Sequence, residues 1–346
     1  MGAARGQRAD ARRVDGLIGL QPRPRGASQI LRNLQTDAPP ATMPYVDRVN
    51  RAIDVIVTQL DQPLRLEEVS RAAGFSPCHF HRIFSALMGE TLGQFVKRVR
   101  LERALSLMSR GPKRPLTDIA LACGFASSSD FSRSFKQRYG VPPSRFDLKA
   151  WRESHRETME ATVREAAEET LLGEGVQFPR LPAGENPDGF EVQLRDLPAR
   201  TVAYIRVLDP YRGTGVVDAV HRLIAWAEAR GLADRQWLGY MWDDPEVVAV
   251  EDTRYDAAVD ITGLDIQPDG EVGVFQFPPM RVAQVPVRGG LEQEVRALDW
   301  LYGTWLPGSG HVPGDQPSFE AWVGRPFGTG YEYFEIDVQL PVVAGG

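Results

Sequence analysis

Two stretches of sequence decide the fold of the first half of the chain: LEEVSRAAGFSPCHFHRIF at residues 66–84 and LTDIALACGFASSSDFSRSF at residues 116–135. The second stretch repeats the first with one inserted residue, so that Gly74-Phe75 returns as Gly124-Phe125. Apolar residues recur at three- and four-residue spacing on both sides of each glycine, which is typical of amphipathic helices. Each stretch therefore predicts a helix, a tight turn and a second helix.

The turn and the start of each second helix are marked by residues with a defined backbone role. Gly74 and Gly124 stand where a short turn needs a residue that tolerates positive φ. Ser76 is followed by Pro77, the pattern of an N-cap and a first helical residue whose φ is preset. Ser127 with Asp130 resembles a capping box. These signals predict where each second helix begins.

The second helix of each unit has one apolar and one polar face. In the first unit Phe80 and Phe84 lie one turn apart and are expected to anchor the helix, while Arg82 lies between them on the outward face. Arg133 takes the same place in the second unit. A helical solenoid gives similar hairpins, but here the sequence holds two copies whose outward residues are basic or small and polar. A pair of DNA-binding helix-turn-helix units is therefore the favoured interpretation.

The charge of the chain is divided unevenly along its length. Residues 44–150 carry 17 Lys and Arg against 10 Asp and Glu, and residues 1–43 carry seven Arg against three Asp. Residues 151–346 carry 16 basic residues against 33 acidic ones, which brings the whole chain to −6. A basic first half predicts a polyanionic partner, although a protein with an acidic tail shows the same asymmetry.

Residues 45–148 resemble the DNA-binding domain of the AraC/XylS family of bacterial transcription regulators. The most specific part of the resemblance is the long pattern GFASSSDFSRSFKQRYGVPPSRF at residues 124–146. The resemblance implies a seven-helix domain in which residues 94–108 run through a long helix that joins the two units. It also implies that the two second helices enter successive major-groove faces of double-stranded DNA.

By matching position, the resemblance implies base contacts from Cys78, His81 and Arg82 in the first unit and from Ser128, Ser129, Ser132 and Arg133 in the second. Cys78 departs from the family pattern, because relatives often carry a larger aromatic side chain there. Arginine can donate two hydrogen bonds to guanine, whereas serine mainly reaches phosphate or a single acceptor. The first unit is therefore expected to be the more discriminating one, and Arg138 is expected to face phosphate.

Composition divides the chain into four parts. Residues 1–43 are rich in Arg, Gly, Ala and Pro and are expected to be a disordered basic tail, or the result of a mis-assigned start, because Met43 directly precedes the first patterned helix. Residues 44–150 form the predicted all-α DNA-binding domain. Residues 151–189 begin as a charged helical segment and end in a Gly/Pro-rich linker. Residues 190–346 form the last domain.

The last domain has the pattern of an α+β fold. Along residues 331–340 polar and apolar residues alternate, as in a half-buried strand, and similar strands flank helical stretches at 216–230 and 291–305. The segment LPARTVAYIRV at residues 197–207 returns 80 residues later as FPPMRVAQVPV. Two pseudo-symmetric halves of one sheet are expected to form a groove where they meet, a common place for ligands.

Residues 190–343 resemble the GyrI-like effector-binding domains that often follow AraC-type DNA-binding domains. The matching stretches are LPARTVAYIRV, GYMWDDPEVV, RYDAAVDI and WLYGTWLPGSGHVPGDQPSFEAWV. The resemblance implies an antiparallel-sheet domain in which a strand glutamate, set among aromatic residues, pairs with a cationic, lipophilic small molecule. The matching residue in this chain is Glu320.

The strand around Glu320 leads to the same candidate without the resemblance. Period-two geometry places Glu320 and Trp322 on one face of the strand, and a carboxylate beside an aromatic ring suits an organic cation. Tyr204, Trp242 and Tyr255 are further candidates for the effector site. The alternative is that Glu320 is solvated and the aromatic residues belong to the core.

Several functional classes find no support in the sequence. Cys78 and Cys123 lack zinc-binding spacing, and His79 and His81 point in different directions on a helix, so we expect no metal and no cofactor. We find no Ser/His/Asp arrangement, HExxH motif or phosphate loop, and expect no enzyme. The absence of a long apolar run or a secretory segment predicts a cytoplasmic protein without a membrane partner.

The expected function is therefore a DNA-binding transcription regulator whose last domain binds a small-molecule effector. Effector binding is expected to change the affinity for DNA or contacts with RNA polymerase. One alternative is a last domain that dimerises or binds a protein, without an effector. Another is a GyrI-like hydrolase, in which a glutamate and a tyrosine activate water.

Overall fold

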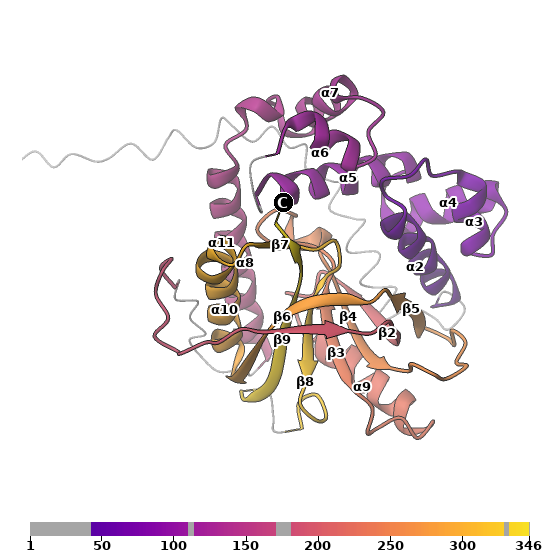
Figure 1. Ribbon diagram of the computed structural model, residues 1–346. Helices are drawn as coiled ribbons and strands as arrows, with labels where there is room; N and C mark the ends of the chain where they lie inside the picture. The colour runs from indigo at the N-terminus through magenta and orange to yellow at the C-terminus, as the bar shows by residue number, and fades with distance from the viewer. Residues whose placement is uncertain (1–42, 110–113, 171–180, 329–331, 346) are drawn as a thin grey trace, which may run out of the picture.

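The computed structural model describes residues 43–109, 114–170, 181–328 and 332–345. The tail expected over residues 1–43 lies outside these ranges except for Met43, and so does the part of the expected linker at residues 171–180. The described chain forms a helical region followed by a sheet with helices, as expected (Figure 1).

The helical region contains the two predicted helix-turn-helix units and the helices that flank them. The long helix α5 joins the units, and α8 carries the chain toward the sheet (Figure 1). The helices are α2 (Met43–Thr58), α3 (Leu66–Ala72), α4 (Pro77–Met88), α5 (Leu92–Ser109), α6 (Leu116–Ala122), α7 (Ser128–Tyr139) and α8 (Leu148–Thr170), with a short 3₁₀ turn at Pro143–Arg145.

The predicted turn and cap residues hold both units in shape. Gly74 and Gly124 have φ of +64° and +77°, as the tight turns require. A Cβ on Gly124 would lie 2.4 Å from the carbonyl oxygen of Leu60, so this turn also needs glycine for close approach. The Ser127 hydroxyl accepts a hydrogen bond from the amide of Asp130 at 3.1 Å, and Ser76 caps α4 in the same way.

Each unit has its own aromatic core, as the paired phenylalanines predict. The ring centroids of Phe80 and Phe84 are 5.3 Å apart, and those of Phe131 and Phe135 are 5.6 Å apart. All four rings are fully buried. They fix the recognition helices α4 and α7 against the rest of each unit, so that the opposite faces of these helices remain free.

The last domain is built on one antiparallel sheet. Its strand order is β1-β6-β9-β8-β3-β4-β2-β5, and β7 pairs with β9 off this path. The strands are β1 (Gln193–Leu197), β2 (Arg200–Leu208), β3 (Trp237–Met241), β4 (Arg254–Asp260), β5 (Gly273–Phe277), β6 (Met280–Gly289), β7 (His311–Pro313), β8 (Ser318–Trp322) and β9 (Phe334–Ala344).

The sheet has the pseudo-symmetry that the second repeat predicts. The order β2-β4-β3 in one half corresponds to β6-β9-β8 in the other, and the halves meet where β3 pairs with β8. The edge strands are exchanged between the halves, because β1 pairs with β6 and β5 pairs with β2. Each half contributes one main helix, α9 (Gly215–Glu228) or α10 (Leu291–Trp300).

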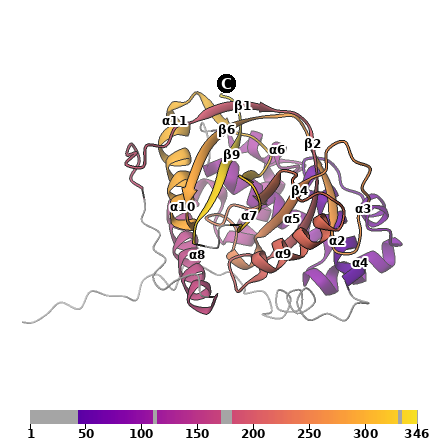
Figure 2. The same ribbon diagram turned by 90° about the horizontal axis from the view of Figure 1, so that it is seen from below.

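The two faces of the sheet have different coverings. Helices α9 and α10 cover one face and bury the larger apolar core, and α10 continues into a π-helical turn at Leu301–Trp305 and into α11 (Leu306–Gly308). Figure 2 shows α9 and α10 against the sheet, with α8 beside α10. The other face carries a cluster of aromatic rings, and α2 packs at its edge against β5.

Candidate functional site

The residues expected to contact DNA lie on the free faces of the two recognition helices. Cys78, His81 and Arg82 are exposed on α4, and Ser129 and Arg133 are exposed on α7. The remaining two candidates, Ser128 and Ser132, are half-buried on α7. Both helices thus present small, polar or basic side chains outward, opposite the phenylalanines that anchor them.

The expectation that Arg138 faces phosphate stays a prediction, and the structure places an acidic residue near it. Its guanidinium lies 3.9 Å from the carboxylate of Glu102, a buried residue of α5, and the Arg138 side chain is 34% exposed. Glu102 is already paired with Arg98, whose guanidinium nitrogen lies 3.1 Å from the carboxylate, so Arg138 adds only a second and longer contact. In α7 the exposed Lys136 is better placed to reach a phosphate.

A large cavity lies at the junction of the two halves of the sheet and extends to the helical region. It encloses about 1790 Å³ and is bounded by β3, β8, α10, α5 and α8. Ten acidic residues line it against five arginines, so its interior favours cations. The acidic residues are Glu102, Asp243, Asp244, Glu246, Glu292, Glu294, Asp299, Asp315, Glu320 and Glu332.

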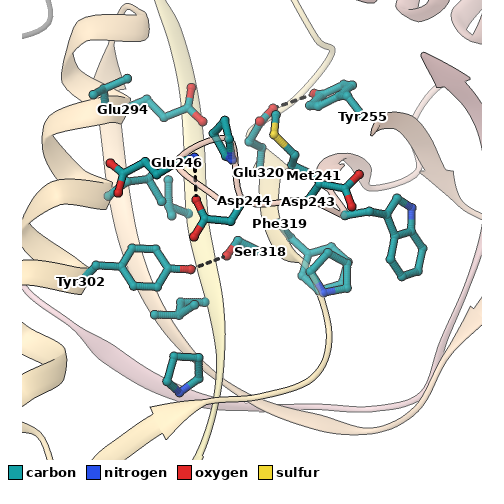
Figure 3. Close-up of a pocket in the computed structure, with 18 of the residues that line it drawn as sticks. Met241, Asp243, Asp244, Glu246, Tyr255, Glu294, Tyr302, Ser318, Phe319 and Glu320 are labelled. Carbon is teal, nitrogen blue, oxygen red and sulfur yellow. Dashed lines mark hydrogen bonds between the residues drawn. The ribbon is translucent and has the colours of Figure 1, made fainter. Parts of the chain in front are cut away.

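Glu320 stands in this cavity as the sequence predicts, with Tyr255 beside it. The Tyr255 hydroxyl donates a hydrogen bond to Oε2 of Glu320 at 2.7 Å (Figure 3). Strand β8 carries Glu320 and strand β4 carries Tyr255, on the face covered by α9 and α10. The alternative of a solvated glutamate is therefore not what the structure shows.

A second glutamate, Glu294 from α10, completes the site. Burial raises the pKa of both carboxyl groups, and the neighbouring Glu320 raises the pKa of Glu294 further. Two neighbouring buried carboxyl groups do not both ionise at low cost, and the larger rise in pKa falls on Glu294, which favours its protonated form beside Glu320. The sequence offered no signal for Glu294, because it lies on the polar side of a helix pattern.

The glycine opposite Glu320 makes room for this arrangement. Gly239 of β3 pairs with Glu320 across the sheet junction. A Cβ at this position would lie 1.9 Å from the Tyr255 hydroxyl oxygen and 2.5 Å from the Glu320 carboxylate. A glycine inside a strand is the sequence signal for such a close approach.

Aromatic and sulfur-containing side chains form the rest of the wall near Glu320. Trp322 lines the cavity as predicted, and its ring centroid lies 4.9 Å from that of Phe327. The hydroxyl of Tyr211 donates to the sulfur of Met241 at 3.1 Å. Figure 3 shows the hydrogen bond between Tyr302 and Ser318, which is 3.2 Å long. A carboxylate, aromatic rings and a thioether together suit a lipophilic cation.

One of the aromatic candidates, Tyr204, belongs to the other face of the sheet. Tyr204 is 1% exposed and donates its hydroxyl hydrogen to Asp54 of α2. Along β2 it alternates with Ala203 and Ile205, which face α9, so Tyr204 points away from Glu320. The prediction that it belongs to the effector site is therefore corrected.

Trp242 lies between the two environments. It lines the outer part of the cavity, but its indole nitrogen donates to Asp256 at 2.7 Å. Its ring contacts Phe275, with centroids 5.2 Å apart, in the aromatic cluster on the other face. Trp242 therefore lines the cavity, while its hydrogen bond and ring contacts tie it to the aromatic cluster of the other face.

The described residues contain neither a membrane-spanning helix nor a cluster of metal-binding side chains. Within residues 43–109, 114–170, 181–328 and 332–345, no helix has the length and apolar character needed to span a bilayer. The same part of the chain contains no group of three or more His, Cys, Asp or Glu side chains that could hold a metal ion.

Known protein families and proteins match both parts of the chain. A helix-turn-helix domain family matches residues 69–149, and a GyrI-like small molecule binding domain family matches residues 190–343. The regulatory protein SoxS of Salmonella typhimurium is 31% identical over 102 residues, which are 30% of this chain and 94% of SoxS. The probable transcription factor PqrA of Proteus vulgaris is 35% identical over 101 residues, 28% of this chain and 81% of PqrA.

Longer relatives and solved structures match over single parts. The probable transcriptional regulator LumQ of Photobacterium leiognathi is 35% identical over 105 residues, and this chain spans 42% of its length. The AdpA DNA-binding domain, solved with a target DNA, is 21% identical with a TM-score of 0.28, over 31% of this chain and 94% of that one. The EcmrR C-terminal domain is 14% identical with a TM-score of 0.35, over 45% and 99%.

The fold and the two surfaces define a DNA-binding transcription regulator with two helix-turn-helix units and a separate α+β domain of the small-molecule-binding type. More particularly, the chain belongs to the AraC family of transcription regulators, and its last domain is GyrI-like. The expected fold class and family are thereby confirmed. The relatives named above are themselves described as regulators or transcription factors.

Proposed function

We propose that the GyrI-like domain senses a lipophilic organic cation, which Glu320 binds at the junction of the two half-sheets. The observation that carries this proposal is the partly buried Tyr255–Glu320 hydrogen bond of 2.7 Å inside a cavity rich in acidic side chains. Binding changes the affinity of the helix-turn-helix units for double-stranded DNA, or their contacts with RNA polymerase.

The physical basis is the partial removal of the Glu320 carboxylate from water. A charge in a partly desolvated site interacts more strongly with a counter-charge than it does at the surface. Burial raises the pKa of Glu320, while the hydrogen bonds of Tyr255 and Glu294 lower it and so favour the ionised form that a cation needs. Trp322 offers an aromatic surface in the same cavity, and the volume is ample for a drug-sized molecule.

On the DNA side, we propose base contacts from the exposed faces of α4 and α7, in which Arg82 and Arg133 read guanine. Their positions between the buried phenylalanines support this assignment. Residues 44–150 act as the DNA-binding domain, residues 151–189 connect the domains, and residues 190–346 act as the sensor.

Replacing the Glu320 carboxylate tests the cation site. Calorimetry on the full chain with tetraphenylphosphonium should give binding to the wild type and a loss of about 3–5 kcal/mol in Glu320→Gln, because a buried charge pair is broken. The neutral triphenylphosphine oxide should bind both proteins equally. Glu191→Gln removes an exposed carboxylate from the same domain and should bind the cation like the wild type.

Two other outcomes of this experiment would contradict the cation site. An equal loss for the cation and the neutral analogue assigns Glu320 a purely structural role. If the wild type binds neither compound, the last domain is better explained by protein contacts or dimerisation, which sedimentation of the full chain measures directly.

The pairing of Glu320 with Tyr255 also suits a hydrolytic role, which an activity assay tests. A glutamate can take a proton from water while a tyrosine hydroxyl stabilises the developing oxyanion. Release of 4-nitrophenol from its acetate ester, above the background rate and abolished in Glu320→Gln, would establish hydrolysis. Equal rates with both proteins would leave sensing as the function.

A further inference from the structure

The loop between β3 and β4 contacts both the cavity of the sensor domain and the core of the second helix-turn-helix unit. We call residues 242–253 the bridging loop. At its start, Asp243, Asp244 and Glu246 line the acidic cavity (Figure 3). Directly after them, Val247 and Val248 are 1% and 3% exposed.

The two valines lie in the core of the second helix-turn-helix unit. They share one hydrophobic cluster with residues of α5, α6 and α7, including Leu105, Ile119 and Phe135. The indole nitrogen of Trp151, in α8, donates a hydrogen bond to the carbonyl oxygen of Val247 at 3.0 Å. A loop of the sensor domain therefore supplies part of the apolar core on which α7 rests.

Glu246 ties the bridging loop to α8 through two arginines. Its Oε2 atom accepts a hydrogen bond from Nε of Arg152 at 2.9 Å, and its Oε1 atom lies 3.1 Å from a guanidinium nitrogen of Arg156. Arg156 also pairs with Asp299 of α10 at 2.6 Å. The Glu246 side chain is 20% exposed, so these pairs are screened less than pairs at the surface.

The carboxylates of the loop and those of the cation site surround one point of the cavity. Four of these acidic residues (Figure 3) line the same cavity as Tyr211, and burial followed by their charge raises the pKa of the Tyr211 hydroxyl. The four are Asp244, Glu294, Glu320 and Glu246. A positive charge bound in the cavity is therefore felt by Glu246 as well as by Glu320.

We propose that the bridging loop carries the regulatory signal: a cation bound at Glu320 draws Glu246 away from Arg152 and Arg156, and this loosens Val247 and Val248 from the second helix-turn-helix unit. This inference rests on the proposed cation site. It makes the second unit the responsive one, so that effector binding changes how firmly α7 is held against its core.

The first unit meets the sensor domain mainly elsewhere and should not respond, although Asp252 of the bridging loop lies 3.9 Å from Arg98 of α5. Its helix α2 places Asp54 against Arg206 at 2.9 Å, on the face of the sheet opposite to the cavity. Within the described residues, the cavity touches that unit mainly at Val57, Leu60 and Val99. The inference thus predicts a change confined to one half of the DNA-binding domain.

Hydrogen–deuterium exchange on the full chain tests the coupling without any ligand. In Glu246→Gln, amides in residues 101–108 and 116–139 should exchange about three- to tenfold faster, as expected for the loss of a half-buried charge pair. Residues 66–88 should be unchanged. Arg152→Gln should behave in the same way, and Glu251→Gln, an exposed charge on the same loop, should match the wild type.

Adding tetraphenylphosphonium to the wild type completes the test. The cation should accelerate exchange in the same segments, and Glu246→Gln should bind it but show no further change. A cation that binds in calorimetry without affecting the second unit overturns the coupling and leaves the cation site standing. Failure of the wild type to bind overturns both. Acceleration in both units, or none in Glu246→Gln and Arg152→Gln, overturns the coupling.

Discussion

Two neighbouring carboxyl groups set the character of the sensor domain at the scale of single residues. Glu294 and Glu320 come from a helix and a strand and are buried at one point, so one proton is held between them. A bound cation favours ionisation of the pair, because it compensates the second negative charge. Cation binding is therefore expected to release protons in addition to filling the cavity.

Replacing Arg82 best tests which side chains of α4 contact the bases. Arg82→Ala should cost about 1–3 kcal/mol on the specific site and relax the preference at one base pair, because an arginine can donate twice to a guanine. Lys136→Ala, at the exposed end of α7, should weaken binding to all sequences about equally. Fluorescence anisotropy with single-base variants of a selected duplex measures both effects.

A folded Arg82→Ala protein with unchanged sequence preference would show that our register of α4 is wrong. Circular dichroism on the variant separates this outcome from a loss of structure. The exposed position of Arg82 makes unfolding an unexpected result.

At the scale of elements, α2 is the contact between the first unit and the sensor domain. Its Asp54 faces Arg206, which also pairs with Asp256 at 2.7 Å inside the aromatic face of the sheet. One turn or two earlier, Asp47 approaches Glu271 in the turn before β5. The helix is therefore held by one attractive pair and opposed by one repulsive pair.

The repulsive pair predicts a pH dependence of stability. Burial, and then the charge of Glu271, raises the pKa of Asp47 from 3.8 to about 7. Because this carboxyl binds its proton more tightly in the folded protein, it contributes most stability below its ordinary pKa and loses it as the pH rises to about 7. Asp47→Asn should therefore raise Tm at pH 8 and match the wild type near pH 4.

Thermal unfolding monitored across this pH range measures the effect. Asp61→Asn, at an exposed position just beyond α2, serves as the control and should follow the wild type at every pH. A constant offset between Asp47→Asn and the wild type from pH 4 to pH 8 would contradict the prediction.

At the scale of the whole molecule, the two domains share structure and do not simply follow one another. Helix α8 packs its Trp151 into the second unit while its Arg156 pairs with α10 of the sensor domain. The bridging loop of the sensor domain in turn packs Val247 and Val248 into the second unit. Both recognition helices are joined in one chain by α5, so a single copy presents two reading surfaces.

The full chain is expected to bind one specific duplex of roughly 20 base pairs as a monomer, because covalently joined recognition helices span major-groove faces about 34 Å apart. The affinity should fall steeply with salt, since phosphate contacts release counterions. Sedimentation of the complex with a labelled duplex gives the stoichiometry. A complex that forms only with two chains on a palindrome would contradict the tandem arrangement.

The sequence by itself determined the elements whose signals are local. Apolar spacing, Gly74 and Ser127 act within a turn or two of the backbone, and strand alternation placed Glu320 and Trp322 on one face. Only the tertiary structure decided what those faces meet. Tyr204 packs against α2, Glu294 of helix α10 lies beside Glu320, and Val247 lies in the core of the DNA-binding domain. These contacts depend on packing and charge pairing between segments that are distant in the sequence. A loop without hydrophobic periodicity gives no local sequence signal that predicts them.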